Sequence, residues 1–223
     1  MLERVPMLII RLAQVITLSI GLLSCTLVPQ ESANLTFGYE GGQVSLLHNH
    51  QDCFILIDGD INQALKKAFA DAKRSAKKQG CAEKMVMIKS HGGDLEVAMD
   101  LGRQIRWEKL STDMHGYCES ACVFTYIGGV KRYVHLNSQV VANSHLGVHQ
   151  PSSELLFHKC IPKTTESGPI VREISQYLHL MLSKEAAAQL SQWIFTTSCQ
   201  KITYIDAATM LNVGIATTQV DFH

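Results

Sequence analysis

Residues 117–132 read YCESACVFTYIGGVKR, a stretch in which Ser120 stands between Cys118 and Cys122. It places the serine at the junction of a strand and a helix. A serine at the start of a helix is most often a cap, because its hydroxyl accepts a hydrogen bond from a free backbone N–H. The same position also suits a nucleophile, since a helix N-terminus stabilises an alkoxide. The stretch alone leaves both interpretations open.

The composition is that of a globular domain. Of the 223 residues, 46% are hydrophobic and 18% are charged, which is enough for a sizeable core. The formal net charge is zero, so a basic stripe for nucleic acid is not supported. The one lysine-rich run, residues 66–78, has the spacing of a solvated helix face. We therefore expect no nucleic-acid partner.

Residues 1–25 differ from the rest of the chain. Arg4 and Arg11 precede an uncharged apolar run over 12–23, a pattern typical of an export signal and too short for a comfortable membrane span. The run ends in LLSC, which resembles the lipobox of bacterial lipoproteins and implies cleavage before Cys25 and lipidation of its thiol. An ordinary cleaved signal and an uncleaved anchor are the alternatives. All three predict export to the periplasm or cell envelope, with membrane attachment through an N-terminal lipid or anchor.

Export would permit disulfides among the six cysteines that remain besides Cys25. Cys53 precedes the first long apolar strand and Cys81 precedes the second. If these strands are parallel neighbours, a disulfide between Cys53 and Cys81 is geometrically reasonable. No cysteine pair has the spacing of a zinc site and no HExxH motif occurs, so we expect neither a metal centre nor another cofactor.

Strands and helices alternate at short intervals beyond a polar linker at 26–42, which predicts one α/β domain over 43–223 with a mostly parallel sheet. Asp94 is expected as an N-cap or first-turn acid. Thr203 and Asp206 have the spacing of a capping box. Strands are expected at 43–47, 53–61, 84–90, 111–116, 131–136, 139–150 and 215–220, and helices at 62–78, 94–107, 170–197 and 203–212.

Three short motifs occur in a particular order. The run SHGGD (90–94) ends a strand, and its glycines let the backbone approach a ligand and direct N–H groups at a developing negative charge. ESAC carries Ser120, and LGVHQPS carries His149 near the end of a strand. A Gly-Gly pair before a helix is usually a tight turn, and a lone histidine is usually structural. The order and spacing of all three are much more specific.

On SHGGD, ESACVF, KRYV and VHQP, the chain resembles the Clp protease proteolytic subunit and its relatives in the ClpP/crotonase superfamily over about 53–217. It looks closest to exported Clp-like proteins that carry a CxSAC motif. The resemblance implies an α/β superhelix of ββα units, with a mostly parallel sheet and packed helices. It also implies a peptide or protein substrate and a homo-oligomer.

The resemblance also implies the roles of individual residues. Ser120 would be the nucleophile and His149 the general base. The N–H groups of Gly93 or Gly92 and of Ala121 would form the oxyanion hole. The chemistry would be acyl transfer, in which the serine attacks a carbonyl and the histidine takes its proton.

Two departures from the family pattern stand out. The interval between the serine and the histidine is several residues longer, so His145 is a second candidate base. The family has an aspartate before the last helix, but here no carboxylate lies between Glu185 and Asp206. Asp206 is better explained as the acid of the capping box. The site is then a dyad, or Ser198 or another neutral group completes it.

The sequence also suggests roles for the other cysteines. A bridge from Cys160, which follows the histidine loop, to Cys199, which lies where the acid is missing, would pin that loop over the site. Cys118 and Cys122 are expected as small buried residues, with a redox or thiol role as the alternative.

The sequence thus predicts an exported Clp-like serine hydrolase, a peptidase that uses Ser120 and His149 without an acid member. The alternative is a catalytically degenerate Clp-like protein that binds partners or serves as a scaffold in the cell envelope. An acyl-CoA enzyme of the crotonase type is disfavoured, because CoA chemistry is intracellular.

Overall fold

The computed structural model describes residues 34–49, 52–136, 144–153, 159–160 and 168–220. The expected export signal over 1–25, with Cys25, lies outside the described residues. Within the described part, no helix has both the length and the apolar character that a membrane span requires.

Nine of the described strands form one sheet, in the order β1-β2-β3-β4-β5-β6-β11, with β7 beside β5 and β10 beside β7. The pairs from β3 to β6, the pair β6–β11 and the pair β5–β7 are parallel, whereas β1, β2 and β3 pair antiparallel, as do β7 and β10. This mostly parallel sheet confirms the predicted α/β class. The strands are β1 (Leu35–Tyr39), β2 (Gly42–Asn49), β3 (Asp52–Gly59), β4 (Ala82–Ser90), β5 (Ser111–Glu119), β6 (Arg132–His135), β7 (His145–Val148), β10 (Thr203–Asp206) and β11 (Thr218–Val220), and β8 (Ser152–Ser153) pairs with β9 (Lys159–Cys160) apart from the sheet.

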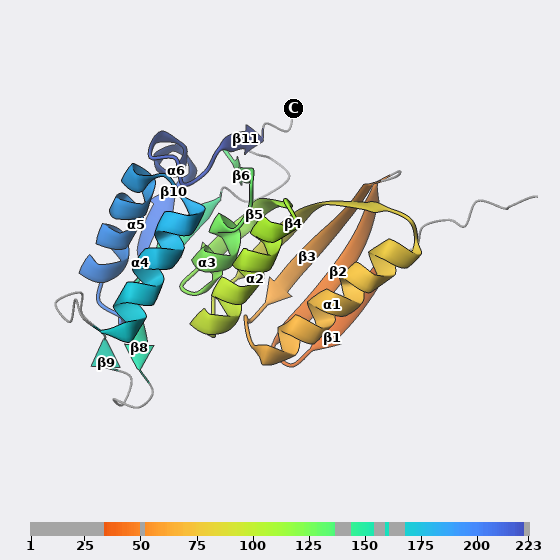
Figure 1. The fold of residues 1–223 in the computed structure, drawn as a ribbon, viewed down its shortest axis with the longest axis horizontal. Coiled ribbons are helices and arrows are strands. Elements are labelled where there is room, and N and C mark those ends of the chain that lie inside the picture. Colours follow the sequence, from red (N-terminus) through yellow and green to blue (C-terminus); the bar gives the residue numbers. More distant parts are fainter. Residues whose placement is uncertain (1–33, 50–51, 137–143, 154–158, 161–167, 221–223) are drawn as a thin grey trace, which may run out of the picture. The chain divides into compact units, whose positions relative to one another are not determined.

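The helices lie over one face of this sheet (Figure 1), with the core between the layers. In β3 every second residue from Cys53 to Ile57 is buried, as expected for a strand with one face on the core. In α1 the buried residues recur at helical spacing, for example Leu65, Phe69 and Ala72. The helices are α1 (Gln63–Lys78), α2 (Leu95–Trp107), α3 (Cys122–Ile127), α4 (Pro169–Met181), α5 (Lys184–Thr196) and α6 (Ala207–Asn212).

Side-chain caps set where α1 and α2 begin. Asn62 accepts a hydrogen bond from the Leu65 N–H at 3.1 Å, and Asp94 accepts one from the Val97 N–H at 3.1 Å. Each cap satisfies a backbone donor that the first helical turn leaves unpaired. Asp94 therefore has the capping role expected from the sequence, and α2 starts directly after the glycines of the SHGGD motif.

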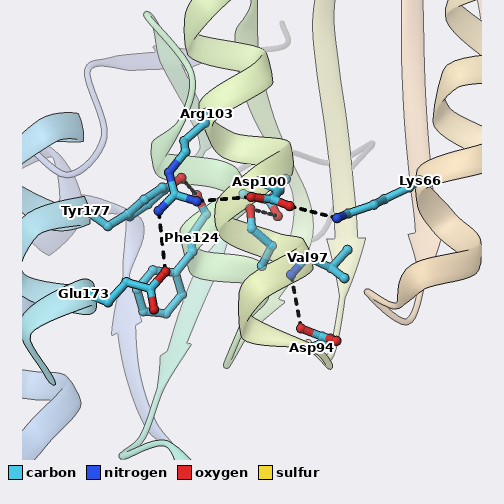
Figure 2. Close-up of polar contacts among 10 residues, drawn as sticks. Lys66, Asp94, Val97, Asp100, Arg103, Phe124, Glu173 and Tyr177 are labelled. Atoms are coloured by element: carbon cyan, nitrogen blue, oxygen red, sulfur yellow. Dashed lines mark hydrogen bonds and ion pairs between the residues drawn. The ribbon is translucent and has the colours of Figure 1, made fainter. Parts of the chain in front are cut away.

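Polar contacts connect the helices around α3, the helix that begins after Ser120 (Figure 2). Asp100 of α2 accepts from Lys66 of α1 at 2.8 Å and from Arg103 at 3.1 Å. Arg103 also lies 3.6 Å from Glu173 of α4. The hydroxyl of Tyr177 in α4 donates to a main-chain carbonyl of α3, that of Phe124, at 2.6 Å. These contacts connect α1 to α2, α2 to α4, and α4 to the short helix.

Three predictions about elements were wrong. The expected helix over 170–197 is two helices, because α4 ends at Met181 and Ser183 caps the start of α5 by accepting from the Ala186 N–H. The expected linker at 26–42 contains strand β1 in its described part. It pairs antiparallel with β2, so the domain begins before residue 43.

The third error concerns the end of the chain, where a helix was expected from residue 203. Residues Thr203–Asp206 instead form β10, paired antiparallel with β7. Asp206 is itself the N-cap of α6 and accepts from the Thr209 N–H at 2.7 Å, which lowers the pKa of its carboxyl. The capping-box spacing was therefore misassigned, because pairing with a distant strand kept Thr203 extended.

Candidate active site

Ser120 occupies the turn between β5 and α3 with φ of +54°, in the left-handed region. Few residues other than glycine adopt this conformation, and those that do cluster at functional sites. Its N–H donates to the Gly147 carbonyl at 2.7 Å, and its carbonyl accepts from the Val123 N–H at 3.2 Å. The turn is thus attached to β7 on one side and to α3 on the other.

Ser120 lines a cavity of about 920 Å³ at the C-terminal ends of β3, β4 and β5. A volume of this order is typical of a ligand pocket. Gly93, Ala121 and His149 line the same cavity, and apolar side chains of α4 and α5, Ile170 and Ile194, form part of its wall. The structure thus brings the predicted serine, histidine and oxyanion-hole residues to one cavity.

The two glycines of the SHGGD motif are required by their surroundings. Both have positive φ, +106° at Gly92 and +139° at Gly93. A Cβ on Gly92 would lie 2.7 Å from the Cβ of Ser120, and one on Gly93 would lie 2.2 Å from the Ile61 carbonyl oxygen. The loop is held against Ile61, whose N–H donates to the Gly92 carbonyl at 2.8 Å. Glycine at both positions therefore lets the loop lie directly beside the nucleophile turn.

The backbone donors of this loop are not equivalent. The Gly92 N–H donates to the Ser90 hydroxyl at 3.0 Å. Across the described residues, the N–H groups of Gly93 and Ala121 donate to no protein acceptor. These two N–H groups can donate hydrogen bonds to an oxyanion and so stabilise its charge. Gly93 is better suited to this role than Gly92, whose N–H already has an acceptor.

His149 follows β7 and has one ring nitrogen held. Its Nδ1 lies 2.7 Å from the carbonyl oxygen of Gln150. Because a carbonyl can only accept, Nδ1 carries the hydrogen, which leaves the lone pair on Nε2. Gln150 is itself fixed, since its N–H donates to the Thr197 carbonyl at 2.8 Å and its Nε2 donates to the Phe195 carbonyl at 2.7 Å. The histidine is in the tautomer that a general base requires.

The segment in which the family's aspartate was expected therefore acts through its backbone. Phe195 and Thr197 hold Gln150, and Gln150 orients the ring of His149. Ser198, the predicted third member, lies in the turn after α5, where its hydroxyl accepts from the Gln200 N–H at 3.3 Å. The group that meets His149 Nδ1 is a main-chain carbonyl.

A buried carboxylate next to the nucleophile escaped the sequence prediction. Glu119 has a side chain only 8% exposed, and its Oε2 lies 2.7 Å from His91 Nδ1. Its other oxygen lies 3.8 Å from Nε2 of His145, and its charge raises the pKa of the Tyr204 hydroxyl. The acid near Ser120 thus pairs with His145 and with His91, which lines the same cavity as His149. Glu119 stands beside Ser120 in the sequence, but nothing there indicates that His91 faces it.

Disulfides join two pairs of described cysteines. Cys53 and Cys81 form the predicted pair, with Cα atoms 5.7 Å apart, and Cys118 and Cys122 form a second pair at 5.3 Å. Both separations are ordinary for a disulfide. For Cys118 and Cys122, burial was predicted correctly, but packing as free thiols was wrong. The two are fully buried, but they are bonded to each other across the serine.

The remaining cysteines are only partly described. Cys199 is in a disulfide, while the side chain of its predicted partner Cys160 lies outside the described residues. Among the side chains that the structure describes, one group has the composition of a metal site, His48 with Cys53 and Cys81. Those two cysteines are bonded to each other, so they offer no thiolates to an ion.

Neither a scan of protein-family models nor a search of curated proteins gave a match to this chain. Solved structures do match. ClpP1 from Listeria monocytogenes has a TM-score of 0.56 at 17% identity, over 76% of this chain and 92% of ClpP1. An enoyl-CoA hydratase, EchA3, from Mycobacterium marinum has a TM-score of 0.52 at 13% identity, over 80% of this chain and 76% of the hydratase.

A third similar structure is the 1510-N membrane-bound stomatin-specific protease, with a TM-score of 0.54 at 13% identity, over 74% of this chain and 77% of the protease. At these identities the likeness shows the fold alone. The fold is that of ClpP and the enoyl-CoA hydratases, as the motifs predicted. The narrower resemblance to exported proteins with a CxSAC motif stays a prediction.

Proposed function

We propose that this protein is a Clp-like serine hydrolase that cleaves peptide bonds with Ser120 as the nucleophile and His149 as the base. One observation carries the proposal. Ser120 sits in a left-handed turn on the wall of a cavity that also holds the N–H groups of Gly93 and Ala121, which have no acceptor among the described residues, and a histidine whose Nε2 bears the lone pair.

The mechanism follows from these groups. The hydroxyl of Ser120 attacks the peptide carbonyl carbon while Nε2 of His149 takes its proton. The N–H groups of Gly93 and Ala121 stabilise the oxyanion of the tetrahedral intermediate. His149 then gives the proton to the leaving amine, and water releases the acyl group by the same route.

The orienting partner of His149 affects the expected rate. A main-chain carbonyl selects the correct tautomer as a carboxylate would, but it carries only a partial charge. It therefore stabilises the imidazolium less than a carboxylate does, and we expect turnover below that of enzymes with a complete Ser-His-Asp set. The apolar side chains of Ile170 and Ile194 in the cavity wall favour substrates with an apolar side chain next to the cleaved bond.

The setting of this activity is part of the proposal. The basic and apolar segment over 1–25 supports export to the periplasm or envelope, with attachment through the Cys25 lipid or an uncleaved anchor. The ClpP fold supports self-association and a protein substrate. Fractionation of cells into soluble and membrane parts, before and after Cys25→Ala, tests the anchor.

The test of the activity is labelling by a fluorophosphonate together with hydrolysis of peptide and ester substrates. Ser120→Ala is expected to abolish both. Ser175 of α4 lies outside the lining of this cavity, so Ser175→Ala is the control and should keep both. Absence of labelling in the folded full-length protein would contradict the proposal.

The alternative function is a catalytically degenerate binding protein on the same fold. The observation that favours it is the neutral partner of His149, since no carboxylate contacts that ring among the described residues. A degenerate protein would leave the fluorophosphonate unreacted, and Ser120→Ala would retain binding to its protein partners in pull-down experiments.

A further inference from the structure

The disulfide between Cys118 and Cys122 spans the nucleophile turn. Cys118 is the penultimate residue of β5 and Cys122 is the first residue of α3. Ser120 lies midway between them, and both cysteines are fully buried. The bond thus closes a ring of five residues around the serine and joins the end of a central strand to the start of the helix.

Ser120 has a strained backbone conformation that must be held in place by its surroundings. A left-handed φ is strained for a serine, because its Cβ approaches the backbone. Apart from the disulfide, the turn is held by hydrogen bonds at Gly147 and Val123. A net contribution from a single hydrogen bond is of the same order as the strain it must offset. Without the covalent bond, these two hydrogen bonds would offset the strain by only a small margin.

Relaxation of the turn would affect the chemistry directly. The direction of the Ser120 side chain and that of the Ala121 N–H both depend on the backbone of these two residues. Gly92 packs against the Ser120 Cβ, so the contact between the loop and the turn would change as well. The nucleophile and the oxyanion donors are therefore aligned only while the turn keeps its shape.

We propose that the Cys118–Cys122 disulfide is a positioning element of the hydrolase site, which holds Ser120 in the left-handed conformation that aligns its hydroxyl with the oxyanion donors. This inference rests on the proposed function of Ser120. The disulfide touches neither substrate nor reacting atoms and acts through the serine.

Kinetics of three variants test the proposal: Cys118→Ala, Cys122→Ala and the double variant. We expect kcat to fall by about 10- to 100-fold, the effect of a misplacement near 1 Å, with KM changed by less than about twofold. Each single variant should lose as much as the double variant, because either change breaks the same bond. Losses that multiply would instead mark two independent packing residues and overturn the proposal.

The control is the double variant Cys53→Ala/Cys81→Ala, which removes the disulfide at the opposite ends of β3 and β4 from the cavity. Its kcat should equal that of the wild type at a temperature where all variants are folded by circular dichroism. An equal fall in kcat in this control would show a general effect of lost stability and overturn the proposal.

A readout independent of catalysis separates this inference from the proposed function. Backbone scalar couplings and carbon shifts of Ser120 report its φ by NMR in the wild type and in the Cys118→Ala/Cys122→Ala variant. The left-handed signature should be present in the wild type and lost in the variant. If it persists in the variant, the positioning role is wrong. A wild type that shows the signature but hydrolyses nothing refutes the hydrolase and leaves the conformational role standing.

Discussion

The disulfides of Cys53–Cys81 and Cys118–Cys122 differ in what they constrain. The first joins residues 28 apart in the sequence, at the N-terminal ends of two neighbouring parallel strands. The second joins residues 4 apart and encloses Ser120. Loop-closure entropy alone gives about 3.6 kcal/mol for the longer ring and about 2 kcal/mol for the shorter one. The bond that contributes more to stability is remote from the cavity, and the bond that contributes less defines the nucleophile turn.

The comparison shows that the amount by which a disulfide raises the free energy of unfolding does not indicate how strongly it determines the geometry of the active site. A long ring removes many conformations of the unfolded chain, whereas a short ring removes few. The short ring instead restricts the folded state, where one strained backbone angle sets the direction of a reactive side chain.

The largest effect on stability is expected from Cys53→Ala/Cys81→Ala. The free energy of unfolding should fall by about 3 to 4 kcal/mol, because the unfolded chain regains the entropy of the closed loop. Urea denaturation followed by circular dichroism measures this loss. If the free energy of unfolding fell less in this variant than in Cys118→Ala/Cys122→Ala, the shorter ring would be the more stabilising one and the prediction would be wrong.

A smaller loss, about 2 kcal/mol, is expected from Cys118→Ala/Cys122→Ala in the same urea experiment. The variant should nevertheless lose far more kcat than the Cys53/Cys81 variant. Opposite rankings in stability and in turnover are the signature of the two roles. The same ranking in both measurements would argue against separate roles.

The non-covalent contact beside the nucleophile has a smaller expected effect. Glu119→Gln removes the negative charge next to His91, but the amide keeps part of the hydrogen bonding. We therefore expect the free energy of unfolding to fall by about 1 kcal/mol. His91→Ala combined with Glu119→Gln in a double-mutant cycle measures the coupling. Additive losses would mean that this contact does not tie the glycine loop to the turn.

The smallest effect is expected at the helix surface, where Lys66 meets Asp100 in Figure 2. Both side chains are more than a third exposed, so Lys66→Met should lower the free energy of unfolding only slightly, because solvent screens the pair. The hydrogen bond from Lys66 lowers the pKa of Asp100 from its ordinary 3.8. The contribution of the pair to the free energy of unfolding is therefore fully present above the ordinary pKa of Asp100. It is lost as the pH falls through the lowered pKa of the folded state.

Unfolding free energies of the wild type and Lys66→Met, measured from neutral to acid pH, check this prediction. The two curves should converge at the acid end. A difference that persists there would point to packing by the lysine stem instead of charge.

Local sequence patterns determined much of the fold. The apolar spacing in 62–78 predicted α1, Asp94 marked the start of α2, and the order of SHGGD, ESAC and VHQP indicated a fold that the solved structures share. These features depend on residues close in the chain, where spacing maps directly onto geometry. The pairing of Cys53 with Cys81 was predictable because neighbouring parallel strands start side by side.

Contacts between distant segments were decided only by the tertiary structure. Strand pairing with β7 turned Thr203–Asp206 into a strand against its capping pattern. The partner of His149 is a main-chain carbonyl, and no side-chain pattern reveals which carbonyl a ring will meet. The carboxylate of Glu119 faces His91 from another strand for the same reason.

The stretch around Ser120 shows both contributions. Its sequence determined that a serine stands between two cysteines where a strand ends and a helix begins. An extended chain would hold the Cα atoms of Cys118 and Cys122 about 13 Å apart. The left-handed turn at Ser120 brings them to 5.3 Å. The glycine loop, β7 and α3 that surround this turn come from elsewhere in the chain, so only the folded molecule could show that the two cysteines are bonded.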